Sequence, residues 1–201
     1  MNMKKIMLSR SIAFCLLTLI CNMAFANSGI YKNLLIGIDT QTGVITGAYH
    51  DERSPTISPS FSCIFALKGN KKERIINVGF PGEKKLALGE IKFQEMLGKK
   101  VVFLKLDEQQ PGCLQTTSFN FLQGDTLELT KSKPWISVMI VVAKKATFYN
   151  APNTRKKRRD YVVYSDCVGI LEIVNDWVKV EYVSENRSLI GWLRLKDLGN
   201  I

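Results

Sequence analysis

The chain has 201 residues, with 28 Lys or Arg, 18 Asp or Glu and one His, so its formal net charge at pH 7 is +10. Hydrophobic residues make up 46% and charged residues 23%, which is typical of a folded globular protein and excludes a disordered one. The single histidine, His50, excludes zinc sites that need two or three histidine ligands. The sequence has neither a G-x-x-x-x-G-K-[ST] loop nor a G-x-G-x-x-G turn, and we expect no cofactor.

The first 26 residues have the three parts of a secretory signal peptide. Three cations lie in residues 4–10, an apolar run too short to span a bilayer covers 12–20, and residues 24–26 (AFA) match a signal-peptidase site. We expect cleavage after Ala26, with an uncleaved N-terminal anchor as the alternative. The protein would then be exported, to the periplasm or the medium, with no membrane span after signal removal.

The expected compartment narrows the class of partner. Loss of the three cations of the signal lowers the net charge from +10 to +7. A basic protein could bind nucleic acid, but export argues against that partner. The anions outside the cytoplasm are cell-wall carboxylates, lipid phosphates and acidic proteins.

Three cysteines follow the signal: Cys63, Cys113 and Cys167. An oxidising compartment permits one disulfide and leaves a spare thiol. We favour a Cys63–Cys113 disulfide because both residues fall in the same predicted domain. The alternative is three buried or idle thiols. A cysteine protease would have to use His50 as its base, which argues against that class.

Short alternating segments broken by turn residues predict an all-β fold. Candidate strands cover 34–38, 44–50, 61–68, 74–80, 101–106, 114–121 and 126–130, while 92–97 (KFQEML) could form a short helix or turn. This spacing predicts an N-terminal β-sandwich or barrel-like domain over residues 27–143. The apolar run 136–143 predicts a strand buried on both faces that leads into a second domain, residues 144–201, with the boundary near Lys144.

The last quarter of the chain has an ordered set of short motifs. They are a small-aromatic-Pro opening at 146–152 (ATFYNAP), a strand and turn at 161–166 (YVVYSD), a strand at 177–182 (WVKVEY), a Gly-Trp pair at 191–192 and a closing Asp-Leu at 197–198. This order resembles the bacterial SH3 (SH3b) domain. The sequence departs from the family pattern at Ser165, where the turn usually has Gly, and at Cys167, where a polar residue is usual.

The SH3b resemblance implies a small SH3-like barrel that binds peptides or peptidoglycan stems and carries out no catalysis. It also implies a groove lined by aromatic residues near the loop after the first strand. The candidates are Tyr149, Tyr161, Trp177, Tyr182 and Trp192.

Strand alternation adds an expectation about the two tryptophans. If Val178, Val180 and Leu193 face the core, Trp177 and Trp192 face outward, together with Lys179, Glu181 and Arg194. Outward tryptophans suit a binding groove. The alternative is that they plug the ends of the barrel and cover its core.

A basic run lies in the polar segment 153–160, which we expect to be a loop. It consists of five consecutive cations, Arg155, Lys156, Lys157, Arg158 and Arg159. These cations repel one another, and guanidinium groups match carboxylates and phosphates in geometry, so the run predicts an anion clamp beside the groove. The alternative is a solvated loop that its charge keeps open.

The acidic residues form no convincing catalytic pair, because Asp51-Glu52 and Asp107-Glu108 are adjacent and point to opposite faces of a strand. The sequence therefore favours a non-catalytic, exported envelope protein that binds a peptide or a peptidoglycan stem. The main alternative is an inhibitor or immunity protein that blocks a cell-wall hydrolase, with the basic loop inserted into an acidic active site. A third class, an enzyme with Asp or Glu at its site, would need acids from distant strands.

Overall fold

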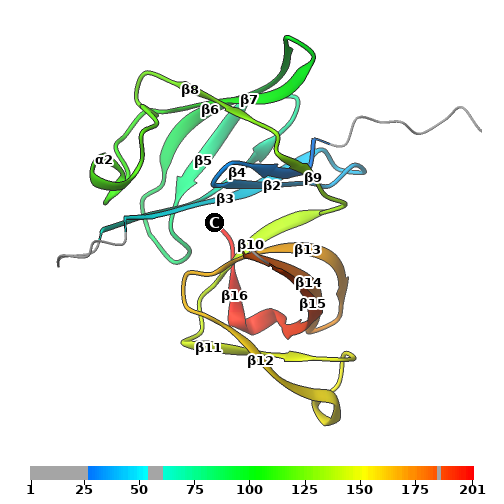
Figure 1. Cartoon of the computed structure of the whole chain (residues 1–201). Helices are drawn as coiled ribbons and strands as arrows, with labels where there is room; N and C mark the ends of the chain where they lie inside the picture. The colour runs from blue at the N-terminus through cyan, green and yellow to red at the C-terminus, as the bar shows by residue number, and fades with distance from the viewer. Residues whose placement is uncertain (1–26, 54–60, 185–186) are drawn as a thin grey trace, which may run out of the picture.

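The computed structural model describes residues 27–53, 61–184 and 187–201, and it confirms the all-β fold class (Figure 1). The predicted signal peptide lies outside the described residues. Within the described residues, no helix has the length and apolar character needed to cross a membrane. The strands form two curled sheets, each shaped as a half-barrel.

The first half-barrel is an antiparallel sheet of nine strands in the order β8-β7-β6-β5-β4-β3-β2-β1-β9. Its strands are β1 (Gly29–Tyr31), β2 (Leu34–Ile38), β3 (Val44–Arg53), β4 (Phe61–Asn70), β5 (Ile75–Gly79), β6 (Ala87–Met96), β7 (Lys99–Leu106), β8 (Asp125–Glu128) and β9 (Lys131–Ser132). Because β8 pairs with β7 and β9 pairs with β1, the single segment 125–132 joins the two edges of the curled sheet.

The core of the first half-barrel forms from the side chains that alternation turns inward. Its centre is a cluster of aromatic rings in which Tyr49 stacks on Phe65 at 5.2 Å between ring centroids and meets Phe121 edge-on at 5.1 Å. The Tyr49 hydroxyl lies 2.7 Å from Thr117 Oγ1, so the one polar atom of this ring is satisfied. The predicted Cys63–Cys113 disulfide is present and ties the short helix α2 (Cys113–Thr116) to β4.

Two predicted elements of this domain are wrong. Residues 92–96 form no helix or turn but the end of β6, because Ile91 and Phe93 face inward in alternation and the strand pairs with β7 throughout. Residues 114–121 form no strand but α2 and the turns after it. Gly112 takes a left-handed backbone (φ 75°) there, which bends the chain to bring Cys113 against β4.

The second half-barrel is a seven-stranded antiparallel sheet in the order β12-β11-β15-β14-β13-β10-β16. Its strands are β10 (Ser137–Val141), β11 (Lys145–Tyr149), β12 (Lys157–Val163), β13 (Cys167–Val174), β14 (Trp177–Ser184), β15 (Arg187–Arg194) and β16 (Leu198–Gly199), with 3-10 turns η1 (Thr154–Lys156) and η2 (Leu195–Asp197). Phe148, Val178, Val180 and Leu193 are fully buried in its core. The change of sheet falls before β10, a few residues earlier than the boundary expected at Lys144.

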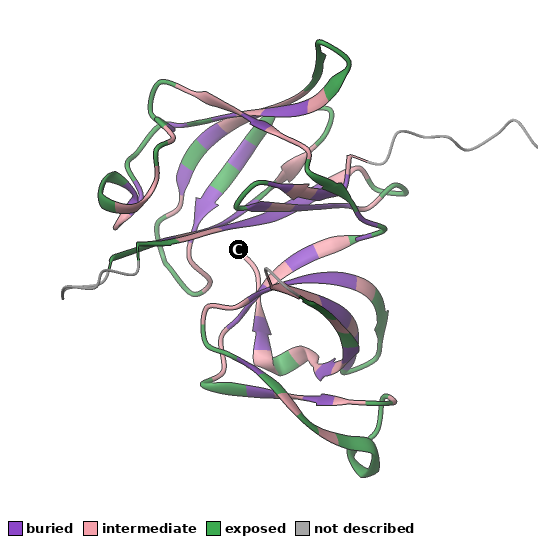
Figure 2. Ribbon diagram, in the orientation of Figure 1, coloured by how far each residue is buried: buried purple, intermediate pink, exposed green. Residues whose placement is uncertain are grey.

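Strand β10 is packed on both faces, as its apolar sequence predicts. Val141 faces the core of the second half-barrel, while Val138 and Ile140 join the buried cluster between the half-barrels. Figure 2 shows buried positions along β10 where it lies between the two half-barrels. The first half-barrel offers a surface of small residues there. A Cβ on Gly37 would overlap the backbone of Ser137, and Ala48 is fully buried beneath the contact. Thr46 accepts a hydrogen bond from the backbone N–H of Val138 at 2.7 Å.

Candidate functional site

A row of side chains crosses the outer face of the second half-barrel, on the side opposite its core. Tyr149 pairs with Lys157 on one neighbouring strand and with Trp192 on the other, and Trp192 in turn pairs with Lys179. Directly paired residues of antiparallel strands point to the same side of the sheet. Four consecutive strands, β12, β11, β15 and β14, therefore present two aromatic rings between two lysines, and we call this set the Lys157–Lys179 row.

The core residues fix the direction in which the row points. Phe148 and Leu193, the sequence neighbours of Tyr149 and Trp192, are fully buried in the core. Gly191 lies across from Val180 and leaves room for the Phe148 ring. The predicted outward position of Trp192 is thus confirmed by the register of the strands.

Trp177 lies beside the row, on the same face of the sheet but largely covered. Its ring meets Tyr149 edge-on at 4.8 Å between centroids, and the Arg194 guanidinium lies 3.9 Å from the ring centroid. These contacts leave Trp177 only 7% exposed. The Trp177 ring therefore packs against Tyr149, and the Arg194 side chain covers the ring and contacts solvent at this position.

The other two predicted aromatic residues stand apart from the row. Tyr161 is 51% exposed on β12, and Lys145 Nζ lies 3.9 Å from its ring centroid. Tyr182 shares the core face of β14 with Val178 and Val180, and its hydroxyl donates to Asp166 at 3.4 Å. Tyr182 is therefore packed against the core and does not reach the outer face.

The five predicted cations do not form one loop. Arg155 and Lys156 belong to the turn η1, whereas Lys157, Arg158 and Arg159 begin strand β12. Alternation then separates them: Lys157 and Arg159 are exposed, and Arg158 folds inward. Arg158 pairs with Asp160 at 2.8 Å, donates to the Ile190 carbonyl at 2.8 Å and lies over the Phe148 ring. It is therefore not available to an external anion.

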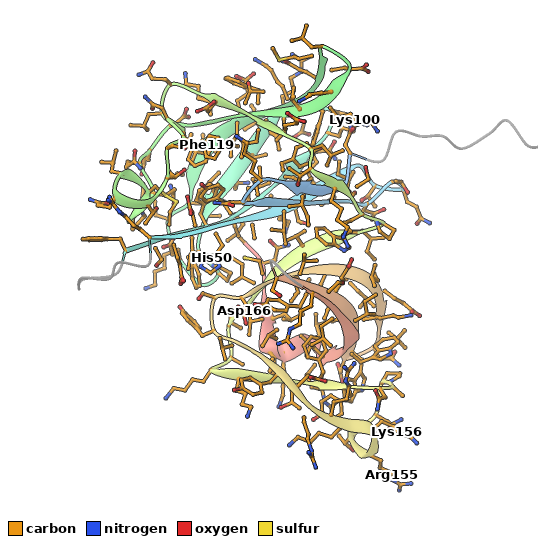
Figure 3. All side chains as sticks on the ribbon, viewed as in Figure 1. His50, Lys100, Phe119, Arg155, Lys156 and Asp166 are labelled. Carbon is orange, nitrogen blue, oxygen red and sulfur yellow. A yellow bond between two sulfur atoms is a disulfide. The ribbon has the colours of Figure 1, made fainter. Side chains whose placement is uncertain are left out.

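The turn η1 holds the remaining two cations at one end of the molecule. Asn153 caps it, because its side chain accepts a hydrogen bond from the Arg155 backbone N–H at 3.1 Å. The Asn150 N–H donates to the Lys156 carbonyl at 2.8 Å and closes the loop. Arg155 and Lys156 project from the tip that lies farthest from the first half-barrel in this view (Figure 3).

At the opposite end of this outer face, next to the first half-barrel, lies a buried network of ion-paired and hydrogen-bonded side chains. Glu181, on the same face of β14 as Trp177 and Lys179, is an ion-pair partner of Lys133 and accepts hydrogen bonds from Ser188 and from Trp135 Nε1, the latter at 2.9 Å. Burial alone would raise the pKa of Glu181, but the hydrogen bonds from Lys133, Ser188 and Trp135 outweigh it and hold that pKa below its usual value. Glu181 is therefore a structural carboxylate.

His50, the one histidine of the chain, does not pair with its sequence neighbour Asp51. The two residues point to opposite faces of β3, and His50 Nε2 lies 3.4 Å from Glu52 instead. In the described part of the chain, no three His, Cys, Asp or Glu side chains gather in a way that could hold a metal ion. Cys167 is buried as a free thiol, and burial raises its pKa to about 12, so it stays protonated at neutral pH.

Alternation alone placed Lys179 and Arg194 on the outer face, but nothing in the sequence pattern joined them to the aromatic residues. The missing information is the register between strands. Comparison with known proteins adds no further residues, because no family model, no curated protein and no solved structure matches this chain.

Proposed function

We propose that the protein is a non-catalytic, exported recognition protein whose second half-barrel binds a short peptide, such as a peptidoglycan stem, on the Lys157–Lys179 row. The observation that carries the proposal is the row itself. Tyr149 and Trp192 occupy directly paired positions of neighbouring strands, and a lysine occupies the paired position at each end. The SH3b resemblance of the same segment supports the same class of ligand.

The dimensions of the row suit a short extended peptide. Neighbouring strands lie about 4.8 Å apart, so the lysines at the two ends are separated by three strand spacings, about 14 Å. An extended peptide rises about 3.3 Å per residue, so four or five residues would span that distance. The rings would pack against the peptide's side chains and amide planes, and the lysines would pair with its carboxylates.

Exposed cations beside the row supply a wider positive surface. Arg159 follows Lys157 on the same face of β12, and Arg194 covers Trp177. Exposed ion pairs of this kind contribute about 1 kcal/mol or less each. We therefore expect the aromatic rings to supply most of the binding free energy, and the cations to orient the ligand and to make binding sensitive to salt.

Co-sedimentation with purified peptidoglycan sacculi tests the proposal. The parent protein should pellet with the sacculi at low salt and less so at moderate salt. The double variant Lys157→Gln/Lys179→Gln should pellet less than the parent at low salt, and its binding should depend less on salt, because it lacks the two cations that pair with the ligand. The matched control, Lys72→Gln/Lys84→Gln, removes the same charge from exposed turns of the first half-barrel and should pellet like the parent. An equal loss of binding in both variants would show that binding depends only on the net charge of the protein, and it would contradict the proposed site.

A second candidate function is inhibition of a cell-wall hydrolase. The observation that favours it is the capped, exposed turn carrying Arg155 and Lys156 at the tip of the molecule. Such a turn could enter an acidic cleft. This function predicts that the parent inhibits a purified hydrolase in a 1:1 complex and that Arg155→Ser/Lys156→Ser weakens inhibition at least tenfold. Unchanged inhibition by that variant would exclude the turn as the inhibitory element.

A further inference from the structure

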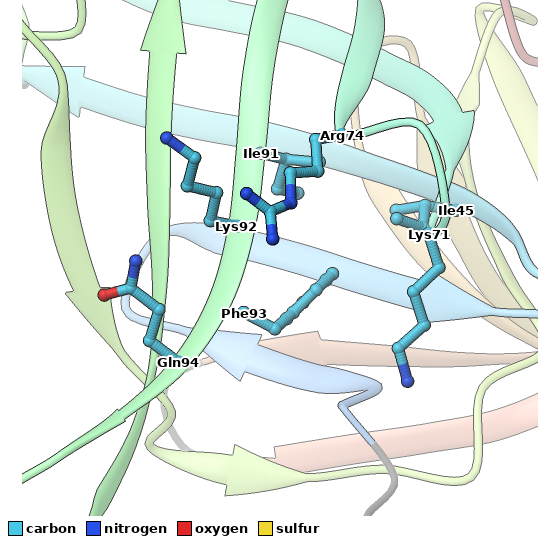
Figure 4. Close-up of a pocket in the computed structure, with 7 residues that line it drawn as sticks. All are labelled: Ile45, Lys71, Arg74, Ile91, Lys92, Phe93 and Gln94. Atoms are coloured by element: carbon cyan, nitrogen blue, oxygen red, sulfur yellow. The ribbon is translucent and has the colours of Figure 1, made fainter.

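The first half-barrel has a cavity of about 220 Å³ that the proposed function does not use. It opens where β5 begins, at Ile75, while β6 continues past it to Met96. The turn between β4 and β5 forms one side of the opening and β6 forms the other, with β3 behind (Figure 4). The cavity is thus a consequence of two neighbouring strands that differ in length.

Cations dominate the polar lining of this cavity. Lys71 and Arg74 come from the β4–β5 turn, Lys92 and Gln94 come from β6, and the lining includes no carboxylate. Lys92 already has an ion-pair partner on β6, because its Nζ lies 2.7 Å from Glu90 Oε1. Lys71 and Arg74 form no ion pair within the residues that the structure describes. Two exposed positive charges therefore face the same opening.

The backbone holds Arg74 in this position. Arg74 has a left-handed conformation (φ 59°), which is unusual for a residue with a Cβ, and its carbonyl accepts a hydrogen bond from the Ile91 N–H at 2.8 Å. In Figure 4 the Arg74 side chain turns back toward β6, whereas Lys71 extends away from it. The guanidinium on this backbone can bind a carboxylate or phosphate through two parallel hydrogen bonds.

The β6 backbone adds a donor and the core adds an apolar floor. Hydrogen-bonding directions alternate along an antiparallel strand, so the Phe93 N–H points to the same side as that of Ile91. No strand within the described residues lies opposite Phe93 on that side, because β5 pairs with β6 only as far as Glu90. Ile45, Ile91 and Phe93 line the cavity as well, and Ile45 and Ile91 are buried in the core.

From this lining we propose that the cavity binds a small anion: a carboxylate or phosphate that carries a compact apolar group. The anionic group would pair with Arg74 and accept from the Phe93 N–H, with the Lys71 charge nearby on the same turn, while the apolar group would lie against Phe93. The volume limits the ligand, because pockets for drug-sized molecules start at about 300 Å³. The site lies on the first half-barrel and does not depend on the proposed peptide recognition.

A titration followed by 1H–15N NMR spectra of the protein tests this site and separates its chemical sources. Phenyl phosphate and benzoate carry both parts of the ligand, inorganic phosphate carries the anion alone, and benzyl alcohol carries the ring alone. We expect saturable shifts at the Phe93 amide with phenyl phosphate or benzoate, at a Kd of about 1 mM or tighter, and much weaker responses to inorganic phosphate and benzyl alcohol. The stronger of the first two identifies the preferred anion.

Variants within a single turn provide the control. Arg74→Gln should weaken binding about tenfold, because it removes the paired donors. Lys72→Gln removes the same charge from the same turn but does not line the cavity, and it should bind like the parent. If Arg74→Gln loses the dispersed spectrum of a folded protein, Lys71→Gln replaces it, with a smaller expected loss. An absence of saturable shifts up to 10 mM, or equal weakening by Lys72→Gln, would overturn the proposal.

Discussion

At the scale of single residues, Ser165 shows the cost of a left-handed backbone at a residue that has a side chain. It lies in the turn between β12 and β13, and its φ is 72°. A side chain in this left-handed region costs roughly 1–2 kcal/mol, which Gly avoids because it has no Cβ. The turn therefore forms despite its sequence, held by the Val163 N–H, which donates to Asp166 Oδ2 at 2.7 Å.

Replacement of this serine should stabilise the protein. We expect Ser165→Gly to raise the free energy of unfolding by about 0.5–1 kcal/mol, which is the steric relief less the greater chain entropy of Gly in the unfolded state. Urea denaturation measures the change. Asn175→Gly is the matched comparison, since Asn175 also has a positive φ (51°) but Asn tolerates this region better. A gain at Asn175 larger than at Ser165 would contradict the explanation.

At the scale of strands, alternation predicted which faces are buried more reliably than it predicted where elements begin and end. The core positions Val178, Val180 and Leu193 follow directly from alternation, whereas Trp177 and Glu181 lie on the outer face of β14 and are buried by other side chains. The extension of β6 through residue 96 was not predicted, because its last residues are exposed and carry little apolar pattern. The helix α2 depends on the disulfide, whose geometric effect on the chain is not visible in a strand pattern.

The sequence predicted three of the four residues of the candidate row, all but Lys179, but not their arrangement. Aromatic residues could be listed and placed on faces, but the Lys157–Lys179 row depends on register across four strands, and register depends on long-range pairing. Tyr182 entered the list through the family resemblance alone, although alternation with Val180 already placed it on the core side. In the sequence, Arg158 does not differ from the four cations beside it. In the structure, alternation along β12 directs its side chain toward Asp160 and Phe148.

At the scale of the whole molecule, the two half-barrels are joined by small residues and one buried ionic network. Gly169 leaves the space that the Trp135 ring occupies, and Trp135 reaches Glu181 from the segment between the sheets. Lys133 and Glu181 are both buried at this junction. Removal of one partner would leave an unpaired charge in a region that excludes water.

Stability should therefore depend on this pair and on pH. Lys133→Met should lower the free energy of unfolding by about 3–5 kcal/mol, whereas Lys133→Met/Glu181→Leu should recover most of that loss. Because the folded state lowers the pKa of Glu181, its contribution is complete above the ordinary value of 4.5 and is lost as pH falls through the lower, folded-state pKa.

Urea denaturation between pH 7 and pH 3 measures both effects. The parent should lose more stability below pH 4.5 than the double variant. Burial raises the pKa of Asp197, whose contribution has the opposite sign, but that residue is the same in both proteins and cancels in the comparison. Parallel pH profiles for parent and double variant would show that Glu181 is not the titrating group.

The central claim is that the outer face of the second half-barrel is a binding surface, and Trp192 tests it most directly. The measurement is isothermal titration of a soluble peptidoglycan stem fragment into the parent, Trp192→Ala and Ile190→Ala. Ile190 is 49% exposed on the same strand but lies outside the row. We predict at least tenfold weaker binding for Trp192→Ala and a parent-like Kd for Ile190→Ala. Absence of binding by the parent, or an unchanged Kd for Trp192→Ala, would contradict the claim.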